Sequence, residues 1–174
     1  DVVDVEFYRG AEKKSVSMEL SKRPMADVPF NPVELAKQAR ALTDPALIEI
    51  EACFEGFTDA QAMKRPTPNE WSALEVVAHL IQGERFNVNY LSSLIDGYEP
   101  TTDGFGSNVN EAVAATVKAN PSIKPMMDAL RHSVDEVLLY VEMIPEEFTA
   151  NKGSYYRFGN GILQPNFHLN AHTQ

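Results

Sequence analysis

The chain has 174 residues, 44% of them hydrophobic, which is enough for one ordinary domain with a sizeable core and a short appendage. Acidic residues outnumber basic ones by 25 to 15, and the net charge of -10 has the wrong sign for neutralising phosphates or docking on anionic lipid. This charge argues against a nucleic-acid partner. A membrane partner is not expected either, because no apolar run approaches the roughly 20 residues that span a bilayer. The single cysteine, Cys53, excludes an internal disulfide framework and predicts a reducing location such as the cytoplasm.

Residues 2–20 carry the pattern of a β-hairpin, because VVDVEFY and SVSMEL alternate apolar and polar residues around the turn sequence RGAEKK. The apolar residues expected on one face are Val3, Val5 and Phe7 of the first strand and Val16, Met18 and Leu20 of the second. An isolated two-stranded hairpin is only marginally stable in water, so we expect it to be the end of a larger domain or to lie on another surface. Residues 1–23 resemble the last two strands of a PDZ domain, but they lack its carboxylate-binding loop and peptide groove.

After the hairpin the pattern changes to a proline-rich linker, 24–31, and then to a helical domain, 32–174, which Asn31 and Pro32 can open. The expected helices are 32–57, interrupted near Pro45 where Thr43 or Asp44 can cap a new start, then 72–95, 108–119, 121–144 and a last one from about Gln164 or Pro165. The stretches 58–70, 96–107 and 151–161 are typical of loops. We therefore predict a mainly α fold, an up-and-down four-helix bundle with a short N-terminal β-hairpin.

Two of the four histidines lie within predicted long helices, and they lie on different kinds of helix face. In the helix 121–144 the apolar residues form a stripe about 120° wide and His132 lies opposite it, so His132 should be exposed. In the helix 72–95 His79 lies at the edge of the polar stripe, in a row with Gly83, Phe86 and Tyr90, and points partly into the bundle. From this helix alone, a core-edge imidazole satisfied by hydrogen bonds explains His79 better than metal ligation does.

The other two histidines stand four residues apart near the end of the chain, in FHLNAHTQ. At this spacing on a helix, Cβ atoms are about 6 Å apart, so the imidazoles of His168 and His172 can converge on one ion. Chance alone also produces such a pair. An inward-facing histidine from a second helix strengthens the case, because facing helices fix both the positions of ligands and their directions of approach.

Three features combine in residues 33–174: Trp71 and Ser72 at the start of the second helix, His79 two turns later, and the pair His168 and His172 near the end. In this combination the chain resembles the DinB-like, or YfiT-like, family of metal-binding four-helix bundles. By transfer of the family pattern, His79, His168 and His172 would be the three protein ligands of a zinc or nickel ion. The family's fourth helix usually continues beyond its second histidine, whereas here only two residues follow.

The resemblance implies a divalent metal with open coordination positions, because three imidazoles leave room for water, a substrate or a small thiol. Family members include putative hydrolases and thiol-dependent S-transferases and isomerases, and a homodimer formed through a bundle face is compatible with the resemblance. Two other functions stay open. One is a non-catalytic binding or scaffold module attached to a PDZ domain, and the other is a helical domain whose inward histidines are satisfied by hydrogen bonds.

Hydrolysis would also need a general base, and two glutamates on the second helix come into question. Glu84 falls on the apolar face, where an unpaired carboxylate would be costly, so we expect it to pair with a basic or hydroxyl group. Glu75 lies one turn before His79 but on the polar stripe. We therefore expect Glu75 to be solvated rather than bonded to the imidazole.

Overall fold

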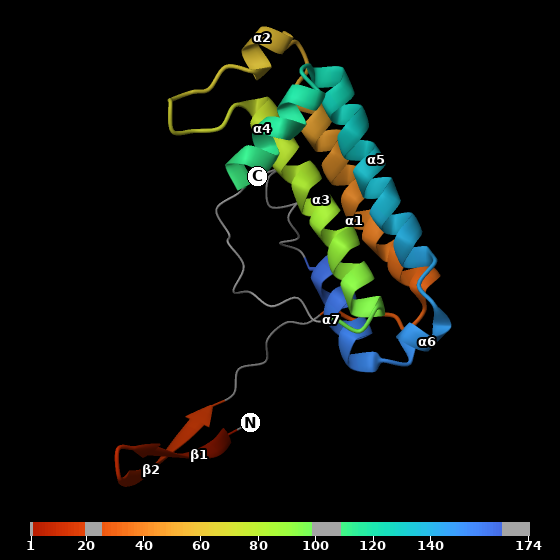
Figure 1. Cartoon of the computed structure of the whole chain (residues 1–174). Helices are drawn as coiled ribbons and strands as arrows, with labels where there is room; N and C mark the ends of the chain where they lie inside the picture. Colours follow the sequence, from red (N-terminus) through yellow and green to blue (C-terminus); the bar gives the residue numbers. More distant parts are fainter. Residues whose placement is uncertain (1, 20–25, 99–108, 165–174) are drawn as a thin grey trace.

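The computed structural model describes residues 2–19, 26–98 and 109–164, and within these segments the chain is mainly helical. The elements are β1 Val2–Arg9, β2 Glu12–Glu19, α1 Pro32–Ala52, α2 Asp59–Ala62, α3 Ala73–Ile95, α4 Val109–Ala119, α5 Ile123–Glu142, α6 Glu146–Thr149 and α7 Lys152–Ile162 (Figure 1). The predicted fold class, mainly α with an N-terminal hairpin, is confirmed. No helix in the described segments has the length and apolar character needed to cross a membrane.

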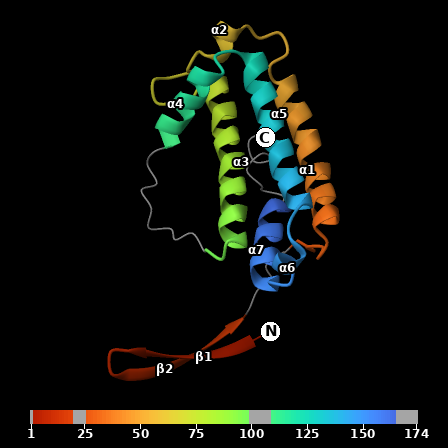
Figure 2. The same cartoon turned by 45° about the vertical axis from the view of Figure 1, so that its right-hand side comes forward.

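The three long helices α1, α3 and α5 lie side by side, and α7 packs at one end of them (Figures 1 and 2). α1 runs opposite to the other two, whereas α3 and α5 run in the same direction, and Ser92 of α3 is hydrogen-bonded to Tyr140 of α5 near their ends (3.0 Å). α4 lies beside the first half of α3, where Gln82 donates to Thr116 (2.5 Å). The helices therefore do not alternate strictly up and down. α4 ends near the start of α3, so α5 begins at the same end of the bundle as α3 (Figure 1).

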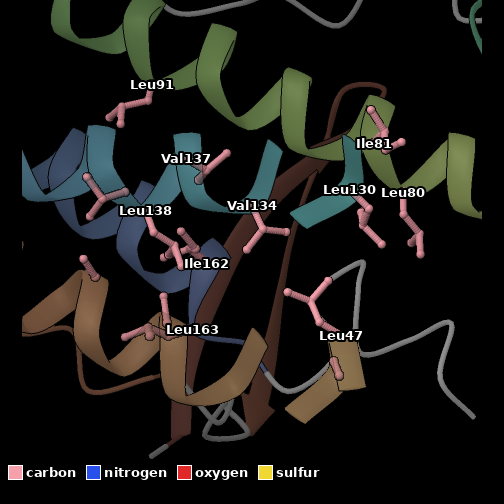
Figure 3. Close-up of a cluster of buried hydrophobic side chains, with 14 of the residues drawn as sticks. Leu47, Leu80, Ile81, Leu91, Leu130, Val134, Val137, Leu138, Ile162 and Leu163 are labelled. Atoms are coloured by element: carbon pink, nitrogen blue, oxygen red, sulfur yellow. The ribbon is translucent and has the colours of Figure 1, made fainter. Parts of the chain in front are cut away.

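The core of the bundle lies between these helices, and Figure 3 shows labelled side chains of α1, α3, α5 and α7 converging on it. Buried residues include Leu47 of α1, Leu80, Ile81 and Leu91 of α3, Leu130, Val134, Val137 and Leu138 of α5, and Ile162 of α7. Each such side chain contributes about 1.5–3 kcal/mol by leaving water. This shared core holds α3 and its site residues in a fixed orientation.

α1 is continuous, so the predicted interruption near Pro45 is wrong. Thr43 does not cap a new helix start, because its side chain is buried and its hydroxyl donates back to the carbonyl of Arg40 (3.3 Å). The same face of α1 is buried before and after the proline, at Ala36 and Ala39 and again at Ala46, Leu47 and Ile50. Packing of this face keeps the helix running through a residue that removes one backbone hydrogen bond.

α7 corrects a second prediction, since the glycine-rich stretch 151–161 was expected to be a loop and is almost entirely helical. Its buried side consists of Tyr155, Phe158, Gly159 and Ile162, a spacing that repeats with the period of a helix. A Cβ atom on Gly159 would lie 2.4 Å from Cγ1 of Val28, so glycine here permits a close approach. The last helix, predicted from about Gln164, lies outside the described residues.

The segment 26–30, which precedes α1, is fastened to α7. The backbone N–H of Ala26 donates to the side-chain oxygen of Asn160 (3.2 Å). The hydroxyl of Tyr155, itself buried, donates to the carbonyl oxygen of Pro29 (3.0 Å). The end of the predicted linker is therefore part of the packed structure, and α1 then begins at its predicted position, Pro32, with Asn31 as its N-cap.

β1 and β2 form the predicted antiparallel hairpin. Its register pairs Val3 with Met18 and Val5 with Val16, which places these residues on one face as expected, while Leu20 lies outside the described residues. Every described residue of both strands is exposed, and the hairpin lies apart from the helices (Figures 1 and 2). The resemblance to a PDZ domain stays a prediction.

Candidate metal centre

The first turn of α3 is fixed by a capping box, which sets the position of His79. The hydroxyl of Ser72 accepts from the backbone N–H of Glu75 (3.3 Å), and the Glu75 carboxylate accepts from the N–H of Ser72 (2.8 Å). This reciprocal pair satisfies two backbone groups that a helix start leaves unbonded. His79 then lies about two turns into a helix whose start is defined.

Glu75 is also held by a cation from the preceding loop. Nε of Arg65 donates to both carboxylate oxygens, at 2.8 and 3.1 Å, and the guanidinium also donates to the carbonyl of Pro68 (3.3 Å). The hydrogen bonds from Arg65 to the carboxylate are the main reason that the pKa of Glu75 is lowered to about 2, and they outweigh the opposing effect of its partial burial. The expected solvation of Glu75 is wrong, because the side chain is 13% exposed and ties the loop to the helix start.

His79 is half-buried on α3, as its place at the edge of the polar stripe predicts. Its ring lies against Trp71, with the ring centroids 4.9 Å apart and the planes inclined by 49°. The indole N–H of Trp71 donates to the side-chain oxygen of Asn110 at the start of α4 (3.2 Å). α4 therefore holds the indole ring that lies against the imidazole of His79. No pattern in the sequence pointed to Asn110 as the partner of Trp71.

The remaining histidines divide as follows. His132 on α5 is exposed, which confirms the prediction made for it. His168 and His172 lie outside the described residues, so His79 is the one candidate ligand that the structure describes. Within residues 2–19, 26–98 and 109–164, no group of three or more His, Cys, Asp or Glu side chains is close enough to hold a metal ion. A half-buried imidazole on a capped helix is a suitable donor for zinc or nickel, and to that extent the described residues fit the ion.

Aromatic rings continue along the face of α3 that carries His79. Phe86 follows His79 by seven residues, which is close to two full turns, so the two side chains project on the same side. Phe86 stacks on Tyr90 with ring centroids 5.8 Å apart, and Tyr90 in turn lies 6.4 Å from the ring of Phe158 on α7. Phe86 is 61% exposed, so an apolar ring faces solvent on this side of the helix.

Glu84 lies on the buried face of α3 and is 2% exposed. One carboxylate oxygen, Oε2, accepts from the side-chain amide of Asn87 (3.2 Å), and Oε1 has no hydrogen-bond partner among the residues that the structure describes. Burial raises the pKa of Glu84 to about 7, against a smaller opposing effect of the Asn87 hydrogen bond. The predicted basic or hydroxyl partner is wrong, because the partner is an amide. Five residues separate Glu84 from His79, which turns the two side chains about 140° apart around the helix.

A comparison with protein families finds that residues 44–174 match the model of the DinB superfamily. The match covers most of the chain and includes the three candidate ligands His79, His168 and His172. No curated protein and no solved structure matches the chain.

Proposed function

The chain belongs to the DinB superfamily, and from this we propose that it binds one divalent metal ion, zinc or nickel, through His79, His168 and His172. The observation that carries the proposal is the extent of the family match, which spans all three histidines. The placement of His79 supports it, because a capped helix and the Trp71 ring limit the orientations open to the imidazole.

Three neutral imidazoles leave at least one coordination position open, as in catalytic zinc sites. When bound, the ion would supply either an acidified water molecule or a small thiol held as its thiolate. The protein would then be a metal-dependent hydrolase or a thiol S-transferase. Its partner in either case is a small molecule, and the rings of Phe86 and Tyr90 on the same face of α3 offer an apolar surface for part of it.

Thiol transfer makes the smaller demand on the described residues. Hydrolysis by a metal-bound water is helped by a protein base, and Glu75 and Glu84 are poor candidates for that task. Glu75 is bonded to Arg65 and to the backbone of Ser72, and Glu84 points to another side of the helix. We therefore place thiol transfer before hydrolysis.

Metal content tests the proposal directly. The chain is purified without a histidine tag, stripped with a chelator and reloaded with zinc or nickel, and bound metal is measured by elemental analysis. We expect about one ion per chain, and a loss of at least ten-fold in affinity for His79→Ala and for His168→Ala. His132→Ala is the matched control, because it removes an exposed histidine from another helix and should leave binding unchanged.

Two outcomes would overturn the metal site: a native chain that neither carries nor takes up zinc or nickel, or a His132→Ala variant that loses as much affinity as His79→Ala. Cobalt substitution then separates the two reactions. A small thiol bound as its thiolate should add a sulfur-to-cobalt charge-transfer band in the near ultraviolet. Absence of that band at saturating thiol would favour hydrolysis.

A non-catalytic scaffold is the second candidate, favoured by the exposed apolar face of the hairpin. That face consists of Val3, Val5, Phe7, Val16 and Met18. In this case the triple variant with alanine at positions 79, 168 and 172 should keep the thermal stability of the metal-treated wild-type chain. A metal-dependent rise in melting temperature that the triple variant lacks would decide against it. Size-exclusion chromatography of both proteins would also test the proposed homodimer.

A further inference from the structure

A pocket of about 260 Å³ opens between α3 and α5, on a different side of α3 from His79. Its lining consists of Glu84, Arg85, Val88 and Asn89 from α3 and of Ser133 and Glu136 from α5. Both helices belong to the packed core, so the walls of the pocket are fixed by regular secondary structure.

Glu84 is the buried group of this lining, and its carboxylate is only partly satisfied. Asn87 donates to one oxygen at 3.2 Å, and the other has no hydrogen-bond partner in the described part of the chain. Leaving a buried acceptor unbonded costs stability, and native proteins keep few such groups. The torsion that orients a glutamate carboxylate is soft, so either oxygen can turn toward a ligand in the pocket.

The other lining groups are mainly acceptors. Glu136 adds a second, exposed carboxylate, and the hydroxyl of Ser133 uses its hydrogen on the carbonyl of Leu130 (2.8 Å), so that its lone pairs can accept. Arg85 brings the one guanidinium, which donates to Thr116 of α4 (3.3 Å). With both carboxylates ionised, the lining has one net negative charge and an excess of acceptors over donors.

We propose that the pocket binds a small organic molecule through a primary ammonium group, with Glu84 and Glu136 as the acceptors of its N–H donors. One positive charge matches the single net negative charge of the lining, and three N–H donors match its acceptors. Val88 gives the carbon skeleton of such a ligand an apolar contact. A divalent metal fits less well, because Arg85 repels it and no third carboxylate or histidine joins Glu84 and Glu136 in the described segments.

Ethylammonium chloride is the probe, and the methyl groups of Val88 report its binding. Valine-labelled protein is titrated at pH 8 and constant ionic strength, and the methyl signals are followed by NMR. Val88 should shift along a saturable curve in the millimolar range. Glu84→Gln, which keeps the shape of the side chain, should weaken binding at least ten-fold, and Glu136→Gln several-fold. Glu142→Gln, an exposed acid of α5 outside the pocket, is the matched control and should not change binding.

Tetramethylammonium carries the same charge without N–H donors and should give no saturable shift. Equal shifts with tetramethylammonium, or unchanged ethylammonium binding in both Glu84→Gln and Glu136→Gln, would overturn the proposal. So would a lack of saturation up to about 100 mM, or tighter saturable binding of magnesium chloride than of ethylammonium. Because Glu136 is exposed, its variant tests the site even if Glu84→Gln alters the core.

Discussion

Replacing Glu84 by glutamine should remove a large part of the pH dependence of stability. The carboxyl group is 2% exposed, and its burial raises the pKa from 4.5 to about 7. Between these two values the folded chain holds a proton that the unfolded chain releases. The contribution of this carboxyl group to the free energy of unfolding is therefore fully present below pH 4.5, and it is lost as the pH rises toward and through 7.

The size of this loss follows from the pKa change. Each unit corresponds to about 1.4 kcal/mol, so a change from 4.5 to about 7 gives a loss of about 3 kcal/mol above pH 7. Glutamine has nearly the same shape and no charge. Glu84→Gln should therefore be about 3 kcal/mol more stable than the wild-type chain at pH 8.5, and within about 1 kcal/mol of it at pH 4.

Urea unfolding followed by circular dichroism at pH 4, 6 and 8.5 measures these differences. Comparing the two proteins at each pH cancels the titration of groups that they share, including Glu75. Glu142→Gln is the matched control, since the same substitution at an exposed site of α5 outside the pocket of Glu84 should shift stability by less than about 0.5 kcal/mol at every pH. An equal wild-type-to-variant difference for Glu84→Gln at pH 4 and pH 8.5 would refute the reasoning.

Three further predictions concern the helices, each measured by urea unfolding. Gly159→Ala should destabilise the fold by about 1–3 kcal/mol, because the new Cβ would lie 2.4 Å from Val28. Gly161→Ala, which has open space around it, should stabilise the fold by up to about 1 kcal/mol. Equal effects of the two substitutions would contradict the close approach at Gly159. Pro45→Ala should stabilise by roughly 1–3 kcal/mol, and any loss would show that the proline is favourable in α1. Ser72→Ala should cost about 1 kcal/mol, and no loss would contradict its capping role.

The parts of the fold that local signals determine were predictable. The start of α3 at Ser72 follows from a hydroxyl residue three positions before a glutamate, and the capping box is present. Helical periodicity likewise placed His132 on the exposed face and His79 at a half-buried edge. These features depend on residues within a few turns of one another, which is the range that a sequence pattern covers.

The errors at Pro45 and in α7 arose where packing between distant segments outweighs local preference. Pro45 and the glycines of α7 are unfavourable in helices, yet both helices form because a buried face runs the length of each. The ion pair of Arg65 with Glu75 joins a loop to a helix, and the amide partner of Glu84 lies one turn away on the same helix. Sequence patterns do not rank such partners, since several polar residues lie at suitable spacings.

The segment 26–30 stands between the hairpin and α1 in the sequence, and its hydrogen bonds join it to α7. Ala26 and Pro29 are bonded to Asn160 and Tyr155, so the first residues described after the hairpin are held by α7 before α1 begins. A polypeptide begun at residue 44, where the family match starts, would lack these contacts, and the buried Tyr155 would lose both its hydrogen bond to Pro29 and its ring contact with Phe30.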